Sequence, residues 1–409
     1  MRRLSFSIVD FFHLSDRRPV LYWAGKIKEH GLSNSLGILR RRILPKLYEL
    51  IKGKMLNVYF APFSKVTRQD DILYAFYDLG TSALDFGVVV FLSIAEEERI
   101  RLGIKNLCLV VVPETDNDLQ KSKNNILATK ENRSERSIQQ EWEWRLRNII
   151  MPSISSLGPH CQIKVFSSRK EAYYFENFFV RFIFPVKYSM SNPTSVNINY
   201  KNTTLSYLIK EFQKTTPSIK SSPRAIQYVS EWIKLKANGR KVITITLREY
   251  IRKPERNSRL KEWADFARSI DNNIFFPVIL RDTDESLRSP PQELDGLTVF
   301  HQPVWNIELR SALYELSYLN LYKENGCCCF CILNRNVRYL NFHSMIDRII
   351  DNWKDEGMHF GASYPWSNQF QKIVWKEDYC NNIKQEFDVM CGKIENFENN
   401  NKKLKKLKI

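Results

Sequence analysis

The sequence predicts an α/β fold made of two doubly wound, Rossmann-like domains that face a cleft, with a helical arm at the N-terminus. Continuous β-branched runs such as Leu107–Val112 and Lys241–Leu247 are typical of strands buried in a parallel sheet. Segments with helical periodicity alternate with these runs, which is the order that parallel sheets require. The chain has 409 residues, 43% of them hydrophobic, and this is enough for two domains with sizeable cores.

Composition shifts along the chain divide it into six expected segments. They are a basic helical arm (1–54), a first Rossmann-like domain (55–185), a linker rich in Ser, Thr, Asn and Pro (186–223), a second Rossmann-like domain (224–345), C-terminal helices that pack back across both domains (346–392) and a Lys-rich tail (393–409).

In the first domain, the apolar run Ile72–Tyr77 predicts a strand that ends in the loop Asp78-Leu79-Gly80. Helical spacing over 84–102 stops at Gly103, and Pro113 ends the next strand. The elements expected after a long polar loop are a helix over 138–150, a strand over 162–166 and a helix over 169–176.

The second domain is expected to begin with a helix over 224–236, which Asn238-Gly239 breaks. Strands are expected over 241–247, 274–280, 297–300, 318–322 and 337–342. Helices are expected over 259–269 and 307–317, and a short helix is expected across the cysteines that follow Asn325-Gly326. Residues 366–391 are typical of a terminal helix pair.

Positive charge is concentrated at the two ends of the chain. The formal net charge is +17, of which residues 1–54 carry +8 and residues 393–409 carry +4, so +5 remains for everything between. Residues 38–51 read as a basic amphipathic helix, which either lies on an anionic membrane or packs on a domain with its charges solvated. A near-neutral centre does not favour nucleic acid as a partner.

No apolar stretch approaches the roughly 20 residues of a spanning helix, and no secretory signal is apparent. We therefore expect a cytoplasmic protein, peripheral at the inner face of the membrane if residues 1–54 bind there. The eight cysteines form no CxxC pair, and the run Cys327-Cys328-Cys329-Phe330-Cys331 favours small apolar packing over a metal or redox site. We predict free thiols and no metal.

The loop that follows the strand over 241–247 carries the strongest functional pattern. Arg248 is the first residue past a buried strand, and Arg256 follows in the same loop. Guanidinium groups bind phosphate bidentately, and Ser258 is placed to cap the next helix, whose N-terminus also attracts anions. The loop is interpreted as a diphosphate clamp; the alternative is a surface loop whose charges pair locally, for example Arg248 with Glu249.

Later loops add candidates at the same sheet edge. In one interpretation Arg281 joins the clamp and Asp282 holds a ribose. In the other, both residues lie in a loop whose charges form salt bridges. Trp305 stacks a base and Glu308 accepts ribose hydroxyls, or Trp305 is a packing anchor. The backbone N–H groups of Asn325-Gly326 meet phosphate, or the pair is only a turn.

In the first domain, Asp78 and Asp85 flank the first strand-to-helix loop. Either is a candidate general base for an acceptor hydroxyl. The alternative for each is a structural role as a turn or cap residue. GxGxxG, GxxxxGK[ST] and GxSxG are absent, which argues against a standard dinucleotide enzyme, a P-loop enzyme and a hydrolase elbow. No cofactor is expected.

Four segments carry a resemblance to a known family. Val242–Glu249, Pro254–Asn257, Val278–Asp284 and Leu321–Gly326 resemble the donor domain of GT-B glycosyltransferases, and most resemble a bacterial surface-polysaccharide group akin to fucosyltransferase-like folds. The resemblance covers roughly residues 55–390. One departure is that Gly326 is followed by cysteines, where similar sequences tend to have Pro and small residues.

The resemblance implies a metal-independent glycosyltransferase. Its first domain binds a glycan or lipid-linked acceptor, and its second binds a nucleotide-diphosphate sugar. The resemblance places Arg248 at the post-strand arginine that binds the donor diphosphate. Together with the loop residues described above, the expected catalytic residues are Asp78, Asp85 and Arg248, and the expected donor-binding residues are Arg248, Glu249, Arg256, Arg281, Asp282, Trp305, Glu308, Asn325 and Gly326. The alternatives are a non-catalytic α/β binding protein, or a protein that binds nucleic acid or another anionic surface through its basic termini.

Overall fold

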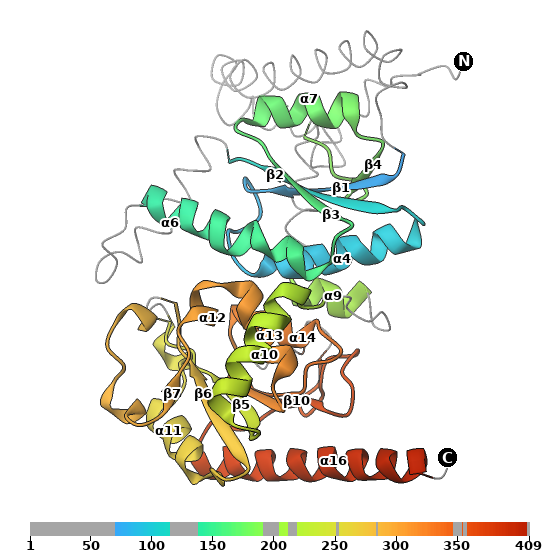
Figure 1. Ribbon diagram of the computed structural model, residues 1–409. Coiled ribbons are helices and arrows are strands. Elements are labelled where there is room, and N and C mark those ends of the chain that lie inside the picture. Colours follow the sequence, from blue (N-terminus) through green and yellow to red (C-terminus); the bar gives the residue numbers. More distant parts are fainter. Residues whose placement is uncertain are drawn as a thin grey trace, which may run out of the picture.

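The computed structural model contains two parallel β-sheets, each flanked by helices and stacked one above the other in Figure 1. The residues that the structure describes are 70–114, 138–190, 204–211, 219–250, 253–283, 285–346, 354 and 358–406. The basic arm over 1–54 lies outside them. The two-domain α/β class predicted from the sequence is confirmed.

The N-terminal domain is built on a four-stranded sheet with the order β3-β2-β1-β4. Its strands are all parallel: β1 (Ile72–Asp78), β2 (Asn106–Val112), β3 (Cys161–Val165) and β4 (Phe182–Phe184). Because β1 and β2 are buried on both faces, they appear in the sequence as continuous apolar runs. The sequence did not predict β4, which has only three residues.

Helices cover both faces of this sheet. On one side α7 (Arg169–Phe179) packs Ala172 and Phe175 against Tyr74 and Phe76 of β1. On the other side lies α4 (Gly87–Arg101). The helix α6 (Ile138–Arg145) continues into a π-helical turn, η2 (Leu146–Ile150), and a 3₁₀ turn, η3 (Pro152–Ser156). The short helix α9 (Leu205–Glu211) follows.

The C-terminal domain contains a six-stranded parallel sheet with the order β10-β9-β8-β5-β6-β7. Its strands are β5 (Lys241–Thr246), β6 (Phe275–Leu280), β7 (Thr298–Val299), β8 (Leu319–Lys323), β9 (Tyr339–Phe342) and β10 (Gln371–Val374). The chain winds outward from β5 to β7, returns to β8 and winds the other way. The order therefore reverses between β5 and β8, and ligands of open α/β sheets bind at such a point, outside the carboxyl ends of the strands.

Helices of the C-terminal domain lie on both sides of its sheet (Figure 1). Between the two domains are α10 (Pro223–Ala237), α12 (Gln302–Trp305), α13 (Ile307–Leu316) and α14 (Cys329–Ile332), which follows the 3₁₀ turn η7 (Gly326–Cys328). On the far side are α11 (Leu260–Ser269) and α16 (Cys380–Lys406).

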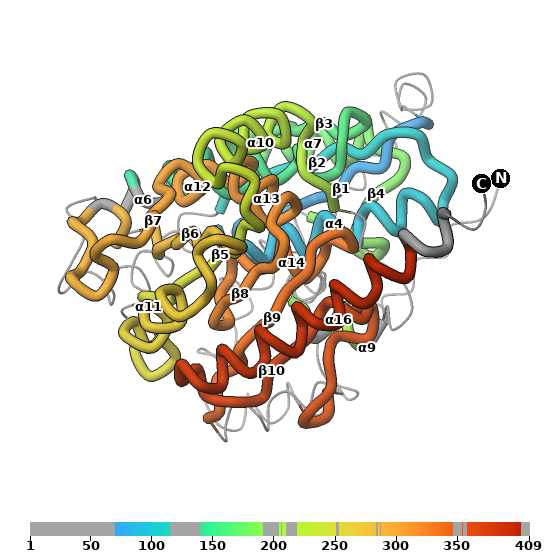
Figure 2. The backbone as a smooth tube through the Cα atoms, turned by 60° about the horizontal axis from the view of Figure 1, so that its bottom comes forward, coloured from blue at the N-terminus to red at the C-terminus, as the bar shows by residue number. Residues whose placement is uncertain are grey.

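The C-terminal segment differs from the expected helix pair over 366–391. It forms the edge strand β10 and then the long helix α16, which runs past β9 and β10 in Figure 2. Ile383, Phe387 and Met390 pack into the same apolar cluster as Trp263 and Phe266 of α11. This helix therefore belongs to the core of the C-terminal domain. No described helix is long and apolar enough to cross a membrane.

The two domains share one continuous apolar cluster. Val88 and Phe91 of α4 belong to it together with Leu313 of α13 and Phe330 of α14. Phe86 meets Phe330 edge-to-face, with ring centroids 6.5 Å apart. The contact brings the loop after β1 against the turn after β8, so the N-terminal domain borders the edge at which the C-terminal sheet reverses its order.

Candidate functional site

Arg248 lies at the carboxyl end of β5, where the sheet order reverses. Its backbone N–H donates a 2.8 Å hydrogen bond to Ser258 Oγ, and its carbonyl accepts one from the Ser258 N–H. Ser258 therefore closes the loop over 248–258. The cap that we predicted for it is wrong, because Asp378 accepts the Arg259 N–H at the start of α11 instead.

The guanidinium of Arg248 is buried and carries a charge that no carboxylate neutralises directly. The residue is 9% exposed; its Nη1 donates to the backbone oxygen of Glu324 over 3.1 Å, and its buried Nε has no hydrogen-bond partner. Among the described residues, no carboxylate oxygen lies within 4 Å of it. Burial lowers the pKa of Arg248, and the charge of Arg256 lowers it further.

A second arginine faces the same place. Arg256 donates from Nη2 to Glu324 Oε1 over 2.5 Å, and its Nε is buried without a partner. The other carboxylate oxygen of Glu324 lies 3.1 Å from Nδ1 of His343, whose ring stacks on Trp375. Burial lowers the pKa of His343, so the imidazole is neutral at pH 7.

Unmet hydrogen-bond donors at this place favour an anion. Glu324 and Asp282 both act on the charge of Arg248, and Lys323, which is 3% exposed, is neutralised by Asp378 Oδ1 at 2.6 Å. Within the described residues, however, the buried Nε atoms of Arg248 and Arg256 have no acceptor, and an anion would supply one.

Glu324 and His343 are members of this cluster that the sequence reasoning did not single out. Each is the first residue past a strand, Glu324 after β8 and His343 after β9. The rule that selected Arg248 would have found both.

Arg281 lies at the same edge, but carboxylates hold it. It is 3% exposed; its Nη2 donates to Glu249 Oε1 over 2.7 Å, and a carboxylate oxygen of Glu285 lies 3.6 Å away. Asp282 accepts the N–H groups of Glu249 and Thr283. Arg281, Glu249 and Asp282 therefore form a buried ion-paired loop next to the Arg248 cluster.

The Asn325-Gly326 turn lies directly after Glu324. Asn325 Oδ1 accepts from the thiols of Cys327 at 2.8 Å and Cys328 at 3.0 Å. A Cβ at Gly326 would lie 3.0 Å from Cδ2 of Phe86, so the absence of a side chain allows the loop of the N-terminal domain to approach.

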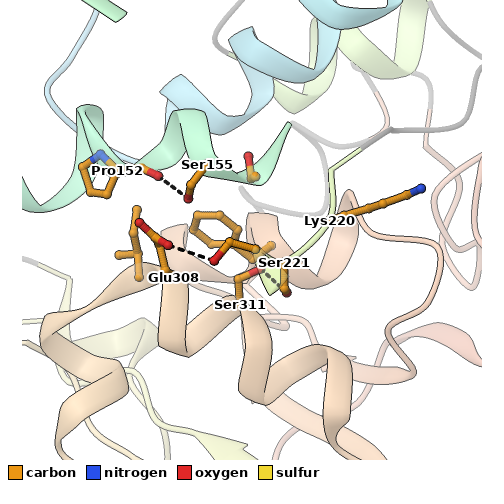
Figure 3. Close-up of a pocket in the computed structure, with 10 residues that line it drawn as sticks. Pro152, Ser155, Lys220, Ser221, Glu308 and Ser311 are labelled. Atoms are coloured by element: carbon orange, nitrogen blue, oxygen red, sulfur yellow. Dashed lines mark hydrogen bonds between the residues drawn. The ribbon is translucent and has the colours of Figure 1, made fainter. Parts of the chain in front are cut away.

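Trp305 and Glu308 lie at the border between the domains. Trp305 meets Trp144 edge-to-face at 6.0 Å, and Glu308 accepts from Ser222 Oγ over 2.9 Å. Figure 3 shows Glu308 and Ser311 lining a pocket between η3 and α13, together with Ser155 and Ser221. Its cavity volume of about 10 Å³ has room for about one water molecule, so the pocket as it stands is too small for a nucleotide.

The two predicted general bases differ in their surroundings. The Asp78 carboxylate is buried and accepts from both terminal nitrogens of Arg169, at 2.6 and 2.9 Å, and from Tyr188 Oη at 2.7 Å. Asp85 is exposed, and one of its oxygens accepts the Gly87 N–H at 2.8 Å. Asp85 precedes Phe86, the residue that touches the Gly326 turn.

One group in the N-terminal domain has ligand types that bind metals. Glu96, His160 and Cys161 each place one ligand atom within 4.8 Å of the others. Arg99 already donates to both oxygens of Glu96, at 2.7 Å each. A metal ion would have to compete with this bidentate pair.

No protein-family model matches the sequence, and no curated protein matches it. Similar solved structures include a family 9 glycosyl transferase from Veillonella parvula (TM-score 0.39, 9% identity, covering 79% of this chain and 98% of that one). Another is ADP-heptose LPS heptosyltransferase II from E. coli (TM-score 0.38, 9% identity, covering 80% of this chain and 99% of that one). A third is the wall teichoic acid polymerase TagF (TM-score 0.34, 10% identity, covering 93% of this chain and 89% of that one).

These similarities concern the course of the chain. TM-scores below 0.4 at about one tenth identity carry no argument about activity, and a kinship to fucosyltransferase-like folds stays an expectation from the sequence. The chemistry of this protein has to be inferred from its own residues at the β5–β8 edge.

Proposed function

We propose that this protein is a glycosyltransferase that binds a nucleotide-diphosphate sugar at the β5–β8 edge. The observation that carries the proposal is the Arg248 guanidinium, which is buried at the reversal point of the sheet and has no carboxylate oxygen within 4 Å among the residues that the structure describes. A buried charge that lacks a partner is costly, and a diphosphate would supply both the missing charge and the missing acceptors.

Arg248 would act mainly on the leaving group. As the bond between sugar and diphosphate breaks, negative charge grows on the diphosphate, and a guanidinium already fixed by the Glu324 carbonyl stabilises it without reorganisation. Removal of one such preorganised donor costs about 3 kcal/mol in comparable sites, which is a hundredfold in rate. In this proposal the two arginines supply the charge that a metal ion supplies elsewhere.

Arg256 would be a second ligand of the same diphosphate. Glu324 holds one of its terminal nitrogens, and the remaining N–H groups stay available to an anion. Glu324 also keeps the two guanidinium groups at a fixed spacing, because its backbone oxygen binds Arg248 and its side chain binds Arg256. Like charges would otherwise separate.

For activation of the acceptor we favour Asp85 over Asp78. Arg169 and Tyr188 donate to the Asp78 carboxylate, whereas Asp85 is exposed on the loop that meets the Gly326 turn. A general base must lie within hydrogen-bond reach of the hydroxyl that it activates. The acceptor we propose is a hydroxyl of a surface polysaccharide or of a lipid-linked glycan.

The experiment is a thermal-shift panel of nucleoside diphosphates and their sugar conjugates on the full chain. We expect at least one compound to stabilise the protein, by about 2.7 kcal/mol at a concentration of 100 Kd. Arg248→Met should abolish the shift. Arg268→Met is the matched control, since Arg268 is exposed on α11 and should leave the shift unchanged.

Once the donor is known, Arg248→Ala should lower its turnover at least a hundredfold. A panel without any stabilising compound, or an Arg248→Met protein that binds the donor as well as wild type, would reject the proposed site.

A further inference from the structure

We propose that Glu96, His160 and Cys161 form a binding site for a divalent cation with affinity for sulfur, and that Zn²⁺ fits this site best. The inference does not rest on the proposed function, because these residues lie at the edge of the N-terminal sheet that faces away from the β5–β8 edge. It departs from the prediction of no metal, which used spacing along the chain, since Glu96 precedes His160 by 64 residues.

The three side chains converge because the fold brings two elements together. Glu96 lies in the second half of α4, and His160 and Cys161 stand at the start of β3. One ligand atom of each residue lies within 4.8 Å of the other two, and His160 Nε2 is 3.0 Å from Glu96 Oε1. The ligand atoms of a tetrahedral Zn²⁺ lie about 3.5 Å apart, so small side-chain rotations would close this set around an ion.

Two of the three ligands are held in place by outer contacts. Arg99 donates to both carboxylate oxygens of Glu96 and is itself anchored on the Ile104 carbonyl, at 2.6 Å. The His160 ring lies close to Gly158, where a Cβ would be 3.6 Å from Nδ1. Contacts of this kind orient the ligands of metal sites and keep them at their spacing.

The Arg99 pair leaves room on the carboxylate for a cation. An ionised carboxylate has about four lone pairs, and the two hydrogen bonds from Arg99 use two of them. His160 Nε2 lies 3.0 and 3.2 Å from the two oxygens of Glu96, so a further group can approach both of them. An ion between Glu96 and His160 would replace this contact, and the charge of Arg99 would lower its affinity without blocking its place.

The donor set selects the kind of ion. Thiolate and imidazole are ligands of Zn²⁺, whereas Mg²⁺ and Ca²⁺ prefer oxygen. Burial raises the pKa of Cys161 to about 12, so this thiol keeps its proton until a metal that binds sulfur displaces it.

An ion can reach the site from solvent. The side chain of His160 is 28% exposed, and Cys161 is only partly buried. With three protein ligands, water would occupy the fourth position of a tetrahedral ion. The ion would join α4 to the edge strand β3, and we therefore expect it to stabilise the N-terminal domain.

Titration of the full chain with Co²⁺ and Zn²⁺ tests the site after treatment with a chelator. Co²⁺ should produce a thiolate-to-cobalt charge-transfer band in the near ultraviolet, and Zn²⁺ should displace it. Cys161→Ser should abolish the band and lower the Zn²⁺ affinity about tenfold or more. Cys380→Ser is the matched control, because Cys380 also lies next to a carboxylate, that of Glu262, and should leave both readouts unchanged.

A second variant and a measurement on wild type complete the test. His160→Asn changes a partly exposed side chain and should also weaken Zn²⁺ binding about tenfold or more, while circular dichroism confirms that the variant is folded. X-ray absorption of the wild-type zinc complex should show a sulfur neighbour. A chain that binds no Zn²⁺, a zinc complex without sulfur, or a cobalt band undiminished in Cys161→Ser would overturn the proposal.

Discussion

At the scale of single residues, two buried arginines at one sheet edge differ in whether a carboxylate neutralises their charge. Arg281 is surrounded by Glu249 and Glu285, whereas the contacts of the Arg248 guanidinium within the described residues are a backbone carbonyl and the face of Tyr250. The first arrangement satisfies a buried charge internally. The second is the arrangement on which the proposed diphosphate site rests.

This contrast predicts opposite effects on stability. Arg281→Met should lower the free energy of unfolding by about 3 kcal/mol, because it leaves Glu249 half-buried and unpaired. Arg248→Met should leave that free energy unchanged or raise it, since it removes a buried cation that has no counter-ion. Urea unfolding of the two variants measures both effects. A large loss of stability in Arg248→Met would show that Arg248 is structural.

At the scale of elements, the segment between β10 and α16 fixes the end of β8. Asp378 is fully buried; it pairs with Lys323, and it accepts from the N–H of Arg259 and from Nε1 of Trp263. One carboxylate thus connects β8, the start of α11 and the C-terminal segment. Glu324 of the arginine cluster is the next residue after Lys323, so this contact also positions the site.

We expect Asp378→Ala to cost about 3–5 kcal/mol at pH 7, because the buried Lys323 loses its close partner and keeps only the longer pair with Glu377, at 3.9 Å, among the described residues. The exposed pair Lys261–Asp265 is the matched control, and Asp265→Ala should cost less than about 1 kcal/mol. Burial alone would raise the pKa of Asp378, but Lys323 and the hydrogen bonds lower it below its ordinary value. Its stabilisation is therefore present above about pH 4 and is lost as the pH falls. The difference between wild type and Asp378→Ala should shrink between pH 7 and pH 3, and a constant difference in urea titrations would contradict this account.

At the scale of the whole molecule, the two domains are held by an apolar contact at the edge of the site. Phe86, from the loop after β1, occupies the space that a side chain at Gly326 would need. Any movement that separates the domains must release Phe86 from Phe330. The position of Asp85 relative to the arginine cluster depends on the same contact.

The contact predicts a coupling between the domains. Gly326→Val should lower the free energy of unfolding by about 1–3 kcal/mol, because the new side chain collides with Phe86. The same substitution in a Phe86→Ala protein should cost much less, which gives a coupling energy of about 1 kcal/mol or more in a double-mutant cycle. Additive effects of the two changes would mean that the residues do not touch in solution.

The sequence by itself determined the α/β class, most strands of both sheets and the place of Arg248. Strands buried on both faces leave continuous apolar runs, and a charged residue directly after such a run must lie at a sheet edge. These signals are local in the sequence, so they can be recognised without knowledge of the tertiary contacts. The edge strand β4 has three residues, of which Phe184 is buried, and it leaves no such run.

Only the tertiary structure decided which charges are neutralised. Arg248 and Arg281 are alike in sequence, yet in the described part of the chain the first has no carboxylate oxygen within 4 Å and the second is paired with Glu249. Their partners come from other strands and helices, many of them far away along the chain. Ion pairing depends on a few ångströms of distance and on burial, and a one-dimensional pattern contains neither. For this reason the sequence located the sheet edge at which we propose the site, and the fold determined which charged residues at that edge are held by ion pairs.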